Sequence, residues 1–209
     1  SEEHDSEVCK EVIASLVSLS KGSMREASFN LLIEYCFDPN VKTKLTACKV
    51  LTAYMTRTQE AHIQEQFAFI LLAMCKDNLN VHVQVAACEG LAAVSQITQK
   101  ELLVEALFEL QQANLGDKIL TAVAEALGYF SSCTKQQAKI ASLLTGLCAH
   151  ENSSVRIAAC KALANYGSSC QSQASSMIHA LLQCCSDSDT FVQAIACESL
   201  GSFIYTAPT

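Results

Sequence analysis

The stretch V-R-I-A-A-C-K-A-L at Val155–Leu163 decides the fold, because its closing phrase recurs along the chain. The related phrases are A-C-K-V-L at Ala47–Leu51, A-C-E-G-L at Ala87–Leu91, V-A-E-A-L at Val123–Leu127 and A-C-E-S-L at Ala196–Leu200. The final leucines follow one another at intervals of 40, 36, 36 and 37 residues. A unit of this length that occurs five times predicts a repeat array rather than one compact core.

Each repeat divides into two halves with the apolar spacing of an α-helix. In one second half, a single face is marked at steps of three and four by Val155, Ala159, Ala162, Leu163 and Tyr166. The chain has 2 Pro and 7 Gly, which suits helix interiors, and it contains no alternating β-type runs. We therefore expect an all-α chain with a lone helix at 5–20 and five pairs: 23–36 with 40–56, 60–76 with 80–96, 99–113 with 117–131, 135–149 with 152–167, and 172–185 with 189–205.

The positions of most of the 12 cysteines match the repeat, which argues against a framework of disulfides. Eight occupy two equivalent places: Cys36, Cys75, Cys148 and Cys185 close the first halves, and Cys48, Cys88, Cys160 and Cys197 lie in the second halves. Ala113 and Ala124 take these places in the third repeat, so each place accepts a small apolar side chain. A free cysteine behaves as such a side chain. We expect buried, unpaired thiols in a reduced cytoplasmic protein, with the nucleus as the alternative.

Three of the four remaining cysteines divide into two kinds. Cys184 aligns with Leu147, so we expect it in the core. Cys133 and Cys170 end matching Ser-Ser-Cys turns and are expected to be more exposed.

Charge and composition exclude several classes of partner. The net charge is −7, and the 14 Lys and Arg are scattered without a basic stripe, which argues against nucleic acid. The chain has no polybasic segment that would indicate binding to a membrane surface, and no uncharged run is long enough to cross a bilayer. Because the repeat is continuous, we expect a single domain over residues 1–209.

The second halves resemble the second helix of HEAT repeats. Val155–Leu163 carries the resemblance best, Val83–Leu91 and Val192–Leu200 share its spacing, and the turn Asp38-Pro39-Asn40 resembles the family's Asp-Pro corner. The resemblance implies a right-handed α-α superhelix of about five HEAT-like helix pairs plus one N-terminal half-repeat, with armadillo repeats as the near alternative. The family's basic position is Lys44 and Arg156 in two repeats and Gln84, Leu120 and Gln193 in the others, so we expect the Asp–Arg ladder within repeats to be incomplete.

The resemblance also allows a check for enzymes of this fold. Di-iron hydroxylases with HEAT-like repeats carry His-Glu pairs in successive second helices, and this chain has none at those places, for example Ile157-Ala158. The sole pair, His150-Glu151, lies in an interhelix turn. The five histidines do not cluster, and none pairs with a cysteine at zinc-finger spacing. We therefore expect no catalytic residue, no metal site and no cofactor.

The solvent-facing row of the second helices is the candidate binding surface. Second helices of such solenoids line the concave face, and on them the repeat pattern places Lys49, Glu89, Glu125, Tyr129, Lys161, Asn165 and Glu198. Tyr129 is the one large aromatic residue in this row, and aromatic residues commonly dominate interface energies. The charges along the row are mixed in sign, so the row favours neither a purely acidic nor a purely basic ligand.

These patterns together predict a non-catalytic scaffold with a concave groove for a protein partner: a peptide, a helix or a domain. The alternative is a regulatory or catalytic domain of an enzyme with an unrecognised site in the groove. The apolar ending Phe203-Ile204-Tyr205 and the initial half-repeat lead us to expect a fragment of a longer protein, or an array that self-associates through uncapped ends.

Overall fold

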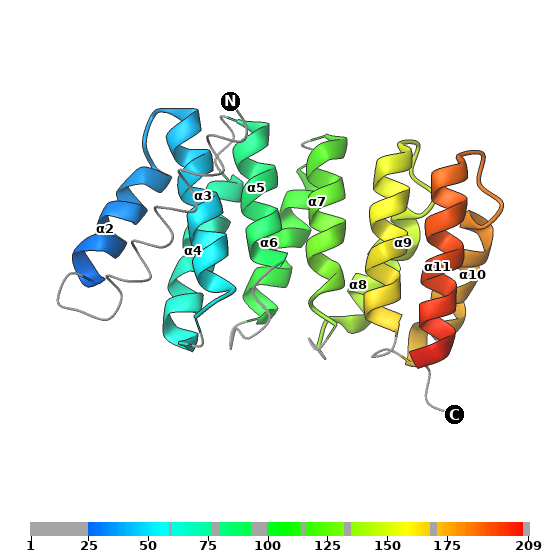
Figure 1. The fold of residues 1–209 in the computed structure, drawn as a ribbon. Coiled ribbons are helices and arrows are strands. Elements are labelled where there is room, and N and C mark those ends of the chain that lie inside the picture. Colours follow the sequence, from blue (N-terminus) through cyan, green and yellow to red (C-terminus); the bar gives the residue numbers. More distant parts are fainter. Residues whose placement is uncertain are drawn as a thin grey trace. The chain divides into compact units, whose positions relative to one another are not determined.

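All secondary structure in the described part of the chain is helical (Figure 1). The computed structural model describes residues 25–58, 60–76, 80–92, 100–113, 116–131, 135–167 and 171–206. Its helices are α2 (Arg25–Cys36), α3 (Val41–Met55), α4 (Ala61–Lys76), α5 (Val81–Ala92), α6 (Lys100–Gln112), α7 (Asp117–Gly128), α8 (Gln137–Leu147), α9 (Ser153–Gly167), α10 (Ala174–Cys184) and α11 (Thr190–Thr206), with a 3₁₀ turn η1 at Gln171–Gln173. The prediction of an all-α chain is confirmed, and the helix predicted at 5–20 lies outside the described residues.

The helices form two compact units. Unit 1 spans Ser1–Thr98 and contains α2 to α5, and unit 2 spans Gln99–Thr209 and contains α6 to α11. In unit 1, α3 packs on α2, α4 and α5. In unit 2 the second helices α7, α9 and α11 lie side by side, with α9 in the middle, while α8 and α10 pack behind them (Figure 1). The single domain and the right-handed superhelix remain predictions.

Short polar side chains start most of the second helices. The Oδ1 atoms of Asn40, Asn80, Asn152 and Asp189 accept hydrogen bonds from backbone N–H groups two residues on, at 2.8 to 3.0 Å. These bonds satisfy amides that have no partner within the helix. The exception is α7, which begins after Gly116 at a φ of 97° without a side-chain cap. A glycine adopts this left-handed conformation without steric cost.

The predicted apolar face of the fourth repeat is the core of unit 2. Val155, Ala159 and Leu163 have no exposed surface, and neither has Tyr166, the largest fully buried side chain. In unit 1 the rings of Phe29, Tyr54 and Phe67 meet edge to face, with centroids 5.3 to 5.7 Å apart. Such edge-to-face contacts add to the stability gained from burial.

The cysteine prediction is correct in the interior and wrong at the last repeat. Cys36, Cys48, Cys75, Cys88, Cys148, Cys160 and Cys184 are buried and unpaired. Cys197, however, is exposed and Cys185 is half-buried. The equivalent side of α9 is covered by a neighbouring helix, whereas no described element covers that side of α11. The assumed equivalence of Ala113 is also wrong, since Ala113 follows the end of α6 and is exposed. Cys133 and Cys170 lie outside the described residues.

Candidate protein-binding surface

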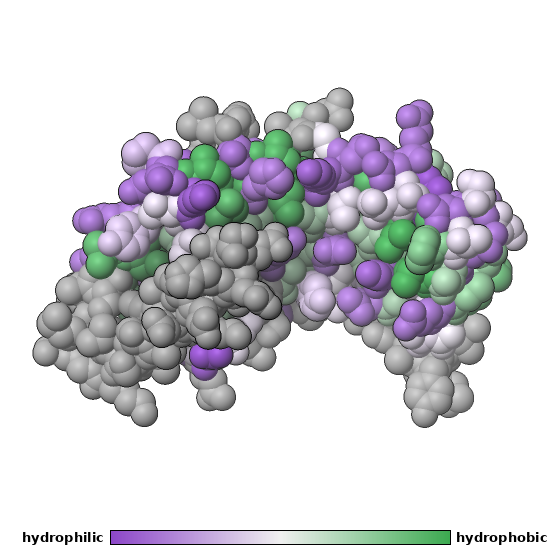
Figure 2. Space-filling model, turned by 45° about the horizontal axis from the view of Figure 1, so that its top comes forward, coloured by the Kyte–Doolittle hydropathy of each residue, from purple (hydrophilic) through white to green (hydrophobic). Residues whose placement is uncertain are grey.

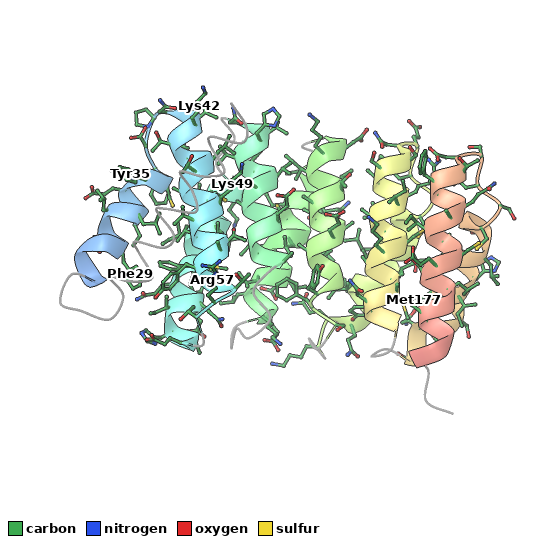
Figure 3. The ribbon with its side chains drawn as sticks, viewed as in Figure 1. Phe29, Tyr35, Lys42, Lys49, Arg57 and Met177 are labelled. Atoms are coloured by element: carbon green, nitrogen blue, oxygen red, sulfur yellow. The ribbon has the colours of Figure 1, made fainter. Side chains whose placement is uncertain are left out.

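The predicted row lies on the second helices, in two parts. Unit 1 presents Lys49 on α3 (Figure 3) and Glu89 on α5, both exposed. Unit 2 presents the rest: Glu125 and Tyr129 at α7, Lys161 and Asn165 on α9, and Glu198 on α11. Because α9 packs against both α7 and α11, the residues of unit 2 share one layer of helices. We call them the unit-2 row.

Helical spacing explains why these side chains reach solvent while their neighbours do not. Lys161 and Asn165 are four residues apart and therefore lie on one face of α9. The residues beside Lys161, Cys160 and Ala162, are buried. Glu125 departs from the expectation because it is half-buried.

Tyr129 is the largest exposed side chain in the row. It is the C-cap of α7, where its backbone N–H donates to the carbonyl of Ala126, and the N–H of Phe130 donates to the carbonyl of Leu127. Tyr129 is 57% exposed, whereas the next residue, Phe130, is 1% exposed. Phe130 therefore anchors this end of the helix in the core, which leaves Tyr129 in solvent.

Polar side-chain contacts join successive repeats of unit 2 at the ends of these helices. The Arg156 guanidinium donates two hydrogen bonds of 2.8 Å to the carboxylate of Asp187 and also donates to the carbonyls of His150 and Glu151. Between this repeat and the one before it, the side chain of Asn152 donates a hydrogen bond of 2.8 Å to the carboxylate of Asp117. These contacts hold neighbouring repeats in register.

The sequence predicts an incomplete Asp–Arg ladder within repeats, but Arg156 pairs with Asp187 of the next repeat, so this ion pair lies between repeats. Where glutamine replaces the basic residue, its amide bonds a backbone carbonyl instead: Gln84 reaches Cys75 at 3.1 Å and Gln193 reaches Asp187 at 2.6 Å. At these two positions a neutral amide therefore donates to a backbone carbonyl of the turn, and the glutamine forms no ion pair between repeats. The Arg156 guanidinium, by contrast, holds the pKa of Asp187 below its usual range, chiefly through its hydrogen bonds.

Two recesses were not predicted from the sequence. One, of about 540 Å³, opens beside Arg156 and is lined by Glu151, Ser153, Arg156, Ser188, Asp189, Thr190 and Phe191. The other, of about 280 Å³, lies between α2 and α3, where Tyr35 and Lys42 line it (Figure 3). Phe191, at 73%, is the most exposed large apolar side chain of the described residues. The only sequence signal for it is a phenylalanine at a helix start where α9 has Ser154.

The surface of the described residues is chemically mixed. Figure 2 shows small apolar areas separated by hydrophilic residues on the face drawn. No helix in the described ranges is long and apolar enough to cross a membrane.

Two of the described thiols, those of Cys36 and Cys185, are poor nucleophiles. Burial raises the pKa of Cys36 to about 12, and burial together with a hydrogen bond to Cys197 raises the pKa of Cys185 to about 11. A thiol with such a pKa is protonated near neutral pH and is a poor nucleophile. His150, in the predicted sole His-Glu pair, lies 4.0 Å from Asp117 and bonds the backbone of Asn152, which is a structural role in a turn.

Comparison with known proteins supports a repeat fold. Residues 117–201 match the family model of HEAT repeats, so the resemblance inferred from Val155–Leu163 is confirmed there. No curated protein matches the chain.

Solved structures of repeat proteins match nearly the whole chain. An archaeal HEAT-like repeats protein from Thermococcus onnurineus NA1 matches with a TM-score of 0.60 at 14% identity, over 98% of this chain and 82% of that one. A designed armadillo repeat protein matches with a TM-score of 0.60 at 16% identity, over 91% of both chains. A second designed armadillo repeat protein, in complex with the peptide (KR)4, matches with the same values. At these identities the likeness shows the fold alone, which is that of HEAT and armadillo repeats.

Proposed function

We propose that this protein is a non-catalytic interaction scaffold that binds a peptide, a helix or a partner domain on the unit-2 row. The observation that carries the proposal is Tyr129, a large aromatic residue that is 57% exposed on an otherwise well-packed layer of helices. Burial of such a ring by a partner removes a large apolar area from water while its hydroxyl keeps a polar contact.

The surroundings of Tyr129 suit an extended partner. Lys161 and Glu198 follow on the next two second helices and alternate in sign with Glu125. Parallel helices pack about 8 to 10 Å apart, so these charges are spaced for successive contacts along an extended chain. A designed armadillo neighbour in complex with a peptide supports the capacity of this fold for such binding. The buried, unpaired thiols support a reducing compartment, the cytoplasm or the nucleus.

The test selects peptides from a displayed random library on the wild-type chain and then measures their affinity for variants. Tyr129→Ala is expected to weaken binding by about 1–3 kcal/mol, as for a residue that anchors an interface, with an unchanged urea midpoint. Leu182→Ala is the matched control, because Leu182 is 51% exposed but lies on α10, outside the row. The proposal fails if a folded Tyr129→Ala/Lys161→Glu variant binds every selected peptide with full affinity.

A further inference from the structure

Three cysteine thiols from three helices of unit 2 meet in its interior. Cys148 is the C-cap of α8, Cys160 lies within α9, and Cys184 is the last residue of α10. Their Sγ atoms all lie within 4.8 Å of one another, and the residues are 7%, 0% and 3% exposed. Within the described ranges, this is the one group of three or more His, Cys, Asp or Glu side chains arranged closely enough to hold a metal ion. We call it the thiol triad.

The repeat does not require sulfur at this junction. One repeat earlier, Ala124 stands in the place of Cys160 and Leu147 in the place of Cys184, and both are buried. The same fold therefore packs well with a small and a large aliphatic residue. Packing alone accounts for one small side chain in the second helix, but not for three convergent thiols.

The spacing of the sulfurs fits a single metal ion. A metal–thiolate bond is about 2.3 Å long, so three sulfurs in a plane around one ion lie about 4.0 Å apart. The triad, with all separations within 4.8 Å, comes to that geometry through small side-chain rotations. The three residues come from separate helices that pack on one another, so the ligand set is formed by the fold before an ion arrives.

The chemistry of the donors selects a soft ion. Thiolates favour Cu(I), zinc and iron–sulfur clusters over hard cations. Structural zinc sites are tetrahedral and need a fourth ligand, whereas the triad offers three thiols and no nitrogen or carboxylate donor. We propose that Cys148, Cys160 and Cys184 bind one Cu(I) ion in trigonal thiolate coordination.

Binding is an exchange of ligands without oxidation or reduction. A small thiol carrier such as glutathione delivers Cu(I), the triad sulfurs replace the carrier's sulfur, and their protons leave to the carrier and to solvent. The bound site carries negative charge, and Arg156 lies four residues before Cys160 on the same helix, where it supplies positive charge. Asp187 already binds that guanidinium, so the compensation is shared.

The test titrates the reduced full chain with Cu(I) under anaerobic conditions, in competition with a chromophoric Cu(I) chelator. The critical variant is Cys160→Ala/Cys184→Leu, which installs the Ala124 and Leu147 pair of the preceding repeat and should therefore fold. The wild type is expected to retain one equivalent of Cu(I) more than this variant. X-ray absorption should show three sulfur neighbours at about 2.3 Å in the wild type.

Unit 1 offers the matched control. Cys75 and Cys88 are also buried, with Sγ atoms 3.5 Å apart, but they form a pair and not a triad. Cys75→Ala/Cys88→Ala should keep the additional equivalent. Cys184→Ser, which preserves the size of the side chain, is a second variant expected to lose it if the double variant does not fold. Equal Cu(I) stoichiometry in the wild type and the triad variants, or zinc that occupies the triad and resists displacement by Cu(I), would overturn the proposal.

Discussion

The repeat of α8 and α9 and the repeat of α10 and α11 carry nearly the same phrase but bury it differently. In A-C-K-A-L, Cys160 and Leu163 have no exposed surface. In A-C-E-S-L, Cys197 is exposed and Leu200 is half-buried. The cause is that α9 packs between α7 and α11, while α11 packs on α9 and α10 with its other side uncovered by any described element. A repeat phrase thus specifies which face is apolar, and the neighbouring helix specifies whether that face is buried.

The largest expected difference is in thiol reactivity. Cys160 should react with a thiol reagent under native conditions at least about a thousandfold more slowly than Cys197, because it is reached only when the unit opens at a free-energy cost of several kcal/mol. Peptide mapping by mass spectrometry after timed labelling measures each cysteine separately, and labelling in denaturant should remove the difference. Comparable native rates would show that the interior repeat opens as freely as the last one.

The second-largest difference between the two repeats should be the cost of introducing a charge. Cys160→Asp is expected to lower the free energy of unfolding by about 3–5 kcal/mol, because it places an unpaired carboxylate in the core. Cys197→Asp should change it by no more than about 0.5 kcal/mol, as at other exposed sites. Urea unfolding followed by circular dichroism measures both. A cost for Cys197→Asp as large as that for Cys160→Asp would mean that the face of α11 is covered in solution.

The ion pair between these repeats should make stability depend on pH. Arg156→Gln, which installs the residue of the Gln84 and Gln193 positions, is expected to cost about 1.5–3 kcal/mol near neutral pH, as for a hydrogen bond to a charged group. The pKa of Asp187 is lowered in the folded state, so the stabilisation is present above its unfolded value of about 3.9 and is lost as the pH falls through the folded value.

The difference in unfolding free energy between the wild type and Arg156→Gln should therefore shrink in acid. Urea midpoints at neutral pH and at about pH 2 measure the change. Lys161→Gln is the control, because Lys161 is exposed and should show no such trend. A difference that stays constant over this range would show that Asp187 is not the group responsible.

The smallest expected effects concern two glycines at equivalent positions. A Cβ atom at Gly128 would lie 2.8 Å from the Cα of Ala162 on α9, so Gly128→Ala should destabilise by about 1–3 kcal/mol through overpacking. A Cβ at Gly201 meets nothing within 4 Å, so Gly201→Ala should stabilise α11 by about 0.5–1 kcal/mol through helix propensity. Thermal unfolding of the two variants shows whether each substitution stabilises or destabilises the protein. A change in the same direction for both would contradict the comparison.

The sequence determined the elements because their signals are local. The recurring phrase predicted the all-α class. Helical spacing also identified Lys161 and Asn165 as exposed, since a position on a helix fixes the direction of its side chain. The HEAT resemblance followed from the same periodicity.

Tertiary structure alone decided what depends on residues distant in sequence. In the sequence, Cys148 and Cys160 appeared in two separate small-residue places and Cys184 as a core residue aligned with Leu147, and only the packing of three helices brought their sulfurs together. The exposure of Cys197 and the bond between Arg156 and Asp187 likewise depend on which helix lies alongside. The physical reason is that a repeat fixes its own apolar face through local geometry, whereas burial, ion pairs and ligand sets arise between repeats.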